Sequence, residues 1–123
     1  MAEEADRQVI EYVQKQEMDY AQTELGTWGR KTRGTDEGET PKKNEVWTIR
    51  MVIKDLNDKL LEDIEKTYVI QHEELPRGVE DIVSEMHHGE EATLITPWYD
   101  AFGQQGTEVI EPFTNLRIEI YLR

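Results

Sequence analysis

The charged and polar side chains that could carry out chemistry in this sequence occur mainly as adjacent pairs. His87 and His88 stand together, and the remaining histidine is His72. Neighbouring residues of a helix point in different directions, and the chain has no cysteine that could complete a zinc site. The pair therefore favours the C-terminal end of a helix, where imidazolium charge is stabilised, over a metal centre.

Acidic residues form further pairs that could suggest calcium binding or acid–base catalysis. They are Glu73-Glu74, Glu80-Asp81 and Glu90-Glu91. None has the loop pattern of an EF-hand, and no feature marks two carboxylates as the matched pair of a glycosidase. The sequence also lacks a Gly-x-Ser-x-Gly motif and a glycine-rich phosphate loop. We therefore interpret these pairs as solvated surface and expect no metal and no other cofactor.

Aromatic residues gather around two prolines in the last third of the chain, where they could bind a peptide. The group consists of Trp98, Tyr99, Phe102 and Phe113, near Pro97 and Pro112. Such side chains either fill a hydrophobic core or form the walls of an apolar cleft that holds a peptide. The spacing is compatible with both interpretations.

The segment before the aromatic group has the pattern of a short helix followed by a strand. Apolar residues recur at the spacing of one helical face, namely Val79, Ile82, Val83 and Met86. Gly89 stands where a left-handed residue would end this helix. The run 92–96 has β-branched character and ends at Pro97.

Strands are predicted on both sides of this helix. Apolar and polar residues alternate along 46–53 and again, strictly, along 116–122. A first strand is expected within 26–33, and two short strand pieces at 60–61 and 68–70. These patterns predict an α+β domain in which an antiparallel β-sheet packs on one short helix.

The N-terminal segment 2–20 contains no glycine or proline and carries a narrow apolar stripe around Val9 and Val13. We expect a helix there that either docks lightly on the domain or projects from it. The sequence thus divides into an N-terminal helical extension, residues 1–25, and one domain, residues 26–123. A single domain of this size can bury its own core.

Composition narrows the function classes. The net charge of −13 at pH 7 argues against nucleic-acid binding, because a phosphate backbone requires lysine and arginine. An uninterrupted apolar run of about 18 residues is absent, so no membrane span is expected. No signal-peptide pattern is present at the start of the chain. The absence of cysteine does not assign a compartment.

The order of these features resembles the C-terminal half of the FKBP-type peptidyl-prolyl cis-trans isomerases. The residues that carry the resemblance are Gly78, Met86, Gly89, Glu90, Ala92, Leu94, Pro97, Phe102, Gly103, Gly106, Val109, Ile110 and Pro112. The resemblance implies an FKBP-like sheet wrapped on one short helix. The layout of an N-terminal helix followed by such a domain is similar to that of exported bacterial members of the family. It implies a chain in the periplasm or anchored, as a lipoprotein, at the outer membrane of a Gram-negative bacterium.

The resemblance also implies a substrate and a site. The substrate would be the X-Pro bond of a proline-containing polypeptide or client protein. The apolar walls would be Met51, Leu75, Val79, Phe102, Val109, Ile110 and Ile118. The polar partner would be Asp63, which with Glu62 is a loose counterpart of the family's Phe-Asp pair. Phe102 and Asp63 would be the catalytic residues.

Several of these positions depart from the family pattern. Phe102 replaces a tyrosine whose hydroxyl bonds the ligand, and Val79 replaces a tryptophan that forms the cleft floor. Pro76 replaces an isoleucine that donates a backbone N–H, which proline lacks. Met51 and Ile118 replace aromatic residues. We therefore expect a degenerate, weakly active isomerase with a role in protein folding; the alternative is a non-catalytic binding or assembly module of the cell envelope.

Overall fold

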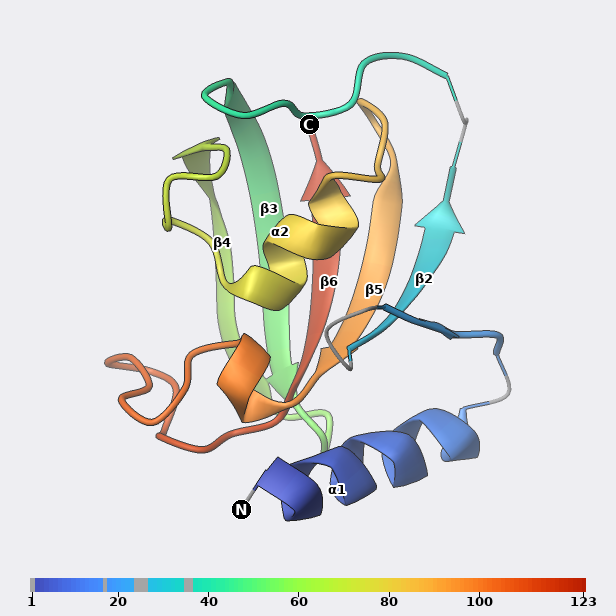
Figure 1. Cartoon of the computed structure of the whole chain (residues 1–123), viewed down its shortest axis with the longest axis vertical. Helices are drawn as coiled ribbons and strands as arrows, with labels where there is room; N and C mark the ends of the chain where they lie inside the picture. Colours follow the sequence, from blue (N-terminus) through green and yellow to red (C-terminus); the bar gives the residue numbers. More distant parts are fainter. Residues whose placement is uncertain (1, 17, 24–26, 35–36) are drawn as a thin grey trace.

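The computed structural model describes residues 2–16, 18–23, 27–34 and 37–123 (Figure 1). In chain order its elements are α1 (Ala2–Lys15), β1 (Ala21–Gln22), β2 (Trp28–Arg33), β3 (Val46–Asp55), β4 (Leu60–Val69), α2 (Arg77–Val83), β5 (Glu91–Thr96), a 3₁₀ helix (Trp98–Asp100) and β6 (Leu116–Leu122). Gly26, where the first strand was expected to begin, lies outside the described residues.

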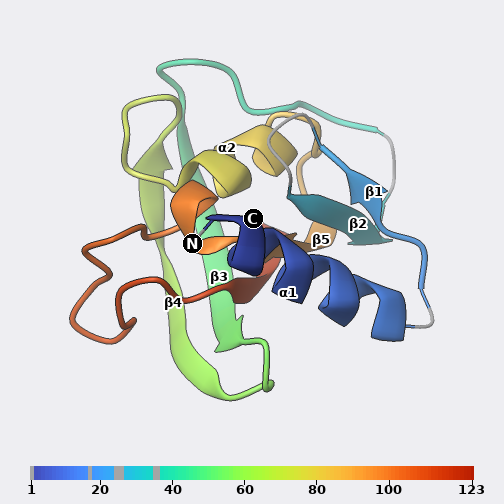
Figure 2. The same ribbon diagram turned by 60° about the horizontal axis from the view of Figure 1, so that its bottom comes forward.

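The described strands form a single antiparallel sheet in the order β1-β2-β5-β6-β3-β4. Figure 1 shows α2 lying across one face of this sheet. Leu94 of β5 packs into the core under α2, whereas its neighbour Ile95 packs against α1, so the two helices cover opposite faces. In Figure 2 the two helices lie apart, with strands between them. The predicted α+β class, a sheet packed on one short helix with an N-terminal helix before it, is confirmed.

The core lies between the sheet and α2. Strand β6 contributes one whole face, and Leu116, Ile118, Ile120 and Leu122 are all buried. Ile49 and Ile53 of the neighbouring strand β3 are buried on the same side. The strict alternation seen in the sequence is therefore the inward and outward alternation of a strand with one buried face.

Several element boundaries differ from the sequence prediction: α1 ends at Lys15, β3 continues to Asp55, β5 begins at Glu91, and β1 was not predicted. Two further differences have a clear physical cause. The helix α2 ends at Val83, earlier than its apolar pattern, but Met86 N still donates a hydrogen bond to Val83 O at 3.1 Å. This tight turn keeps Met86 in the core. Strand β4 is one continuous strand, where two short pieces were expected, because it pairs with β3 from Leu60 to Val69 with a single register shift between Ile53 and Lys54.

Helix α1 docks on the domain. Val9 and Tyr12 are buried against Ile95, and the Tyr12 hydroxyl donates a hydrogen bond to Asp58 Oδ1 at 2.7 Å. Asn115 Nδ2 donates to Gln8 Oε1 at 2.9 Å. The docking alternative of the sequence prediction is therefore the observed one. Within the described residues, neither helix is long and apolar enough to cross a lipid bilayer.

Replacing Ile82 with alanine should lower the free energy of unfolding by about 2–5 kcal/mol, because it would leave a cavity in the core. Ile82 is only 7% exposed, and its Cδ1 lies so close to Gly29 of β2 that an added Cβ there would be 2.8 Å away. Chemical denaturation measures the loss. The matched control is Ile10→Ala on the outer side of α1, where a change below about 0.5 kcal/mol is expected. An equally small loss at Ile82 would contradict its assignment to the core.

Candidate functional site

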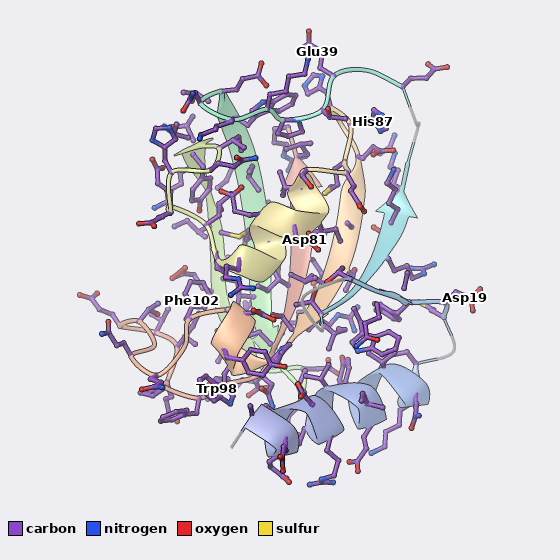
Figure 3. The ribbon with its side chains drawn as sticks, viewed as in Figure 1. Asp19, Glu39, Asp81, His87, Trp98 and Phe102 are labelled. Atoms are coloured by element: carbon purple, nitrogen blue, oxygen red, sulfur yellow. The ribbon has the colours of Figure 1, made fainter. Side chains whose placement is uncertain are left out.

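A groove of about 740 Å³ runs between the segment that follows β4, the first turns of α2 and the segment 101–102. Its lining residues are Gln71, Glu73, Glu74, Leu75, Pro76, Arg77, Glu80, Asp81, Ser84, Ala101 and Phe102. Figure 3 shows Phe102 on the loop beside α2 and Asp81 on α2 itself. The lining therefore combines an apolar group, here called the apolar centre (Leu75, Pro76, Ala101 and Phe102), with an acidic group, here called the acidic rim (Glu73, Glu74, Glu80 and Asp81).

The segment after β4 forms one wall, and backbone hydrogen bonds to acidic side chains fix its path. Gln71 N donates to Glu80 Oε1 at 3.0 Å, and Val69 N donates to Glu74 Oε1 at 3.3 Å. Gln71 and Glu73 have φ angles of 61° and 62°, so the chain turns sharply through two left-handed residues. This turn brings the next residues, 75 and 76, over the start of α2.

Pro76 is the residue before the first turn of α2, and it lines the groove. The backbone atoms of Pro76 are therefore among those that a ligand could contact. Its φ of −57° suits the start of a helix, and its carbonyl accepts the first helical hydrogen bond from Glu80 N at 2.9 Å. Proline has no N–H group, so the groove lacks a backbone donor at this position.

The loop that carries Phe102 forms the opposite wall. Gly103 N donates to Trp98 O at 2.9 Å, which fixes the turn behind Phe102. Gly106 has a φ of 64°, and an added Cβ there would lie 2.3 Å from Ile110 O, so only glycine fits. The loop thereby turns Ile110 into the core and leaves Val109 48% exposed.

The structure brings most of the predicted wall residues together. Met51, Leu75, Val79, Ile110 and Ile118 belong to one core cluster, and Phe102 packs against it. Only Leu75 and Phe102 of this set line the groove. Val79 and Ile118 have 0% exposure, so both belong to the interior of this cluster and offer no surface to the groove. Val109 lies on the exposed part of the loop and does not line the groove.

The structure does not bring Asp63 to the groove. Asp63 pairs with Val52 in the sheet register, whereas Ile64 pairs with Met51, so Asp63 points to the face away from the core. Arg50 donates two hydrogen bonds to its carboxylate, at 2.9 and 2.7 Å. This guanidinium lowers the pKa of Asp63. Glu62, the other member of the pair, pairs with the buried Ile53 and therefore shares the core-facing side.

Asp100 lies directly behind the groove and is the most unusual carboxylate of the site. It is 3% exposed, its Oδ1 lies 3.7 Å from Arg77 Nε, and its Oδ2 has no hydrogen-bond partner among the described residues. Burial raises the pKa of Asp100, the guanidinium of Arg77 opposes the rise, and the nearby Asp6 and Asp81 add to it. Sequence reasoning missed this residue, because a lone aspartate after two aromatics carries no motif.

Asp100→Asn should make the protein more stable than the parent at pH 7, and the advantage should shrink towards pH 3. A carboxyl group with a raised pKa in the folded state favours folding while it is protonated. That stability is lost as the pH rises through the pKa of Asp100 in the folded state. At neutral pH the parent protein is therefore destabilised by the buried carboxylate, and the asparagine variant is not. Denaturation curves across this pH range measure the difference. A variant that is less stable at pH 7 would mean that the ion pair with Arg77 dominates.

Comparisons with known proteins agree with this geometry. A family model described as FKBP-type peptidyl-prolyl cis-trans isomerase matches residues 37–123. A peptidyl-prolyl cis-trans isomerase from Pseudomonas syringae pv. tomato str. DC3000 has a TM-score of 0.78 at 20% identity, covering 99% of this chain and 93% of that one. FkpA from Escherichia coli has a TM-score of 0.82 at 17% identity, covering 98% of this chain and 59% of that one. No curated protein sequence gave a match. At these identities the two structures establish the likeness of the fold alone.

Proposed function

Because this chain belongs to the FKBP-type peptidyl-prolyl cis-trans isomerase family, we propose that its groove binds proline-containing polypeptide and accelerates X-Pro isomerisation only weakly. The observation that carries the proposal is the groove itself. Its centre keeps the apolar residues Leu75, Pro76 and Phe102, while the floor residue Val79 is buried out of reach.

Isomerisation requires no nucleophile, which suits a groove of this kind. Rotation about an amide bond has a barrier of about 18–20 kcal/mol because the planar form is stabilised by resonance. The twisted amide has lost this resonance and is less polar than the planar one. Apolar walls such as Leu75 and Phe102 therefore disfavour the planar ground state more than the twisted state, which lowers the barrier.

The weakness of the proposed activity follows from three missing interactions. Pro76 offers no backbone N–H, Phe102 offers no hydroxyl, and Val79 offers no exposed ring surface to a proline. Hydrogen bonds and ring contacts that form only with the twisted amide are those that raise the rate. A groove that retains apolar contact alone keeps substrate binding and loses much of the acceleration.

The test is a protease-coupled assay on a series of Ala-X-Pro-Phe peptides, with Phe102→Ala as the groove variant. We expect a small but measurable acceleration in the parent and at least a roughly tenfold loss in the variant, since most of the apolar wall is removed. Phe113→Ala is the matched control, because Phe113 is exposed and does not line the groove. Equal activity of Phe102→Ala and the parent would place the activity elsewhere.

The second candidate is a non-catalytic binding module that uses the same groove. The observation that favours it is that the apolar contacts are retained while the donors at positions 76 and 102 are absent. The assay separates the two candidates when it is combined with a binding measurement. Peptide binding that Phe102→Ala abolishes, without any acceleration by the parent, would support the binding module.

We further propose that residues 1–25 form an extension of the domain 26–123, and that this extension adds the edge strand β1 to the sheet of the domain. We also propose that the protein works as a folding factor in the cell envelope, in the periplasm or as a lipoprotein. The support is the layout of a helix before the domain, which resembles exported bacterial members of the family. Fractionation of cells that express the tagged full-length protein tests the location. Recovery in the cytosolic fraction alone would contradict it.

A further inference from the structure

We propose that the groove selects proline-containing segments that carry lysine or arginine close to the proline. The inference rests on the proposed function, because it assumes that a proline occupies the apolar centre. It concerns a different part of the site, the acidic rim, which consists of Glu73, Glu74, Glu80 and Asp81.

The rim carries an excess of negative charge that the protein itself does not neutralise. Among the residues that the structure describes, no lysine or arginine forms an ion pair with any of the four rim carboxylates. Arg77 is the one basic residue of the described lining, and its Nε lies 3.7 Å from the carboxylate of Asp100. The positive charge of Arg77 is therefore directed, in part, to a buried acid behind the groove.

Two of the rim carboxylates are held in place by backbone hydrogen bonds, and the other two accept no such bond from the described part of the chain. Glu74 and Glu80 accept backbone hydrogen bonds from Val69 and Gln71, which keeps their charges beside the groove. Both donors are neutral backbone N–H groups, so neither hydrogen bond brings a positive charge to the rim. Glu73 and Asp81 line the groove as well, and they can be changed without breaking those two bonds.

The arrangement of apolar centre and acidic rim defines the partner. An extended peptide advances about 3.3 Å per residue, so side chains one to three residues from a bound proline reach the rim. A lysine or arginine there gains several unpaired carboxylates at once, whereas a glutamate is repelled by them. Low-dielectric walls strengthen such a local field. Charge complementarity therefore favours basic segments over acidic ones of the same apolar content.

The experiment uses the full-length protein and two fluorescent peptides with the same Leu-Pro centre, one flanked by lysines and the other by glutamates. Fluorescence anisotropy should show that the lysine peptide binds at least about fivefold more tightly at low salt. The ratio should fall towards one at about 0.5 M salt, because the Debye length is then only a few ångströms. This salt dependence is measured on the parent protein, so it does not require that any variant folds.

Variants place the effect in the rim. Glu73→Gln combined with Asp81→Asn keeps the side-chain shapes and should reduce the preference for the lysine peptide about threefold to tenfold. The matched control is Glu3→Gln combined with Asp19→Asn, which removes the same charge from exposed positions that do not line the groove. An equal effect of both double variants would show that net charge alone acts, and would overturn the inference.

Failure of the inference and failure of the proposed function give different results. If both peptides bind with equal affinity, the rim does not select, and the inference fails while the proposed function stands. If replacing the proline with alanine leaves the affinity of the lysine peptide unchanged, the groove does not recognise proline. In that case the proposed function fails, and the inference fails with it.

Discussion

Macrolide ligands of the FKBP family are expected to bind this protein roughly 1.5 to 4 orders of magnitude more weakly than they bind a member with the full aromatic cleft. Each hydrogen bond lost from a buried ligand group costs about 1–3 kcal/mol, and a tenfold change in affinity corresponds to about 1.4 kcal/mol. Two such bonds are missing, because Pro76 lacks an N–H and Phe102 lacks a hydroxyl. Titration calorimetry measures the difference, and nanomolar binding would contradict it.

The missing donors can be restored in this chain. Pro76→Ile combined with Phe102→Tyr returns both groups, and we expect it to recover much of the lost affinity. The pair must be made together, because neighbours in one site are not additive. Val79→Trp is less suitable, since Val79 is wholly buried and a tryptophan would overpack the core. A folded double variant that still binds no macrolide would show that the closed floor, rather than the donors, is decisive.

Val9→Asp should lower the free energy of unfolding by about 2–4 kcal/mol. Val9 is 1% exposed between α1 and the sheet, and burial of a valine side chain contributes about 1.5–3 kcal/mol. A carboxylate cannot remain unpaired in that position, so the helix is expected to leave the sheet. The loss is therefore limited by the docking energy of α1. Chemical denaturation followed by tryptophan fluorescence would measure it, because Trp28 packs against the same cluster.

The neighbouring residue provides the control for this prediction. Ile10→Asp introduces the same charge one position along the helix, where the side chain is 38% exposed, and should cost well under 1 kcal/mol. Equal losses in the two variants would mean that the charge destabilises α1 itself. Deleting residues 1–25 addresses the proposed domain boundary. If 26–123 is a domain by itself, the shortened chain unfolds cooperatively, at a lower denaturant concentration than the full chain.

The fold could be predicted from the sequence because its strongest signals are periodic. Strand β6 alternates without exception, and one buried face of a sheet imposes that alternation. The end of α2 was predicted less well. Met86 continues the apolar spacing of the helix, but it is buried by a tight turn after Val83, and spacing alone does not distinguish the two.

The position of Asp63 shows that the pairing register of a strand determines which face of the sheet each side chain occupies. Tyr68 and Ile64 are four residues apart in β4 and share its core-facing side, which leaves Asp63 on the other side. Once β4 is treated as one continuous strand, this parity follows from the sequence. Two short strand pieces carry no such parity, so they leave Glu62 and Asp63, the loose counterpart of the family's Phe-Asp pair, without a register.

The site was harder to predict than the fold, because the exposure of a site residue depends on which side chains from other parts of the chain cover it. Val79 and Ile118 belong to one core cluster, yet both have 0% exposure, and the sequence gives no direct signal of how completely a residue is covered. The acidic pairs were interpreted as solvated surface, and two of them contribute to the groove rim. The turn after β4, with its left-handed residues Gln71 and Glu73, places the pair Glu73-Glu74 there, whereas α2 carries the pair Glu80-Asp81.

The two edges of the sheet matter for a protein whose partners would be incompletely folded chains. Such chains expose strands that seek unpaired backbone groups, and an open sheet edge can capture them or start aggregation. One edge, β4, carries Glu62, Asp63, Glu65 and Lys66 within ten residues, and charged side chains disfavour the addition of another strand. The other edge, β1, is only two residues long. Under the proposed function, the charges on β4 and the shortness of β1 would disfavour the addition of a strand from a bound polypeptide to these two edge strands.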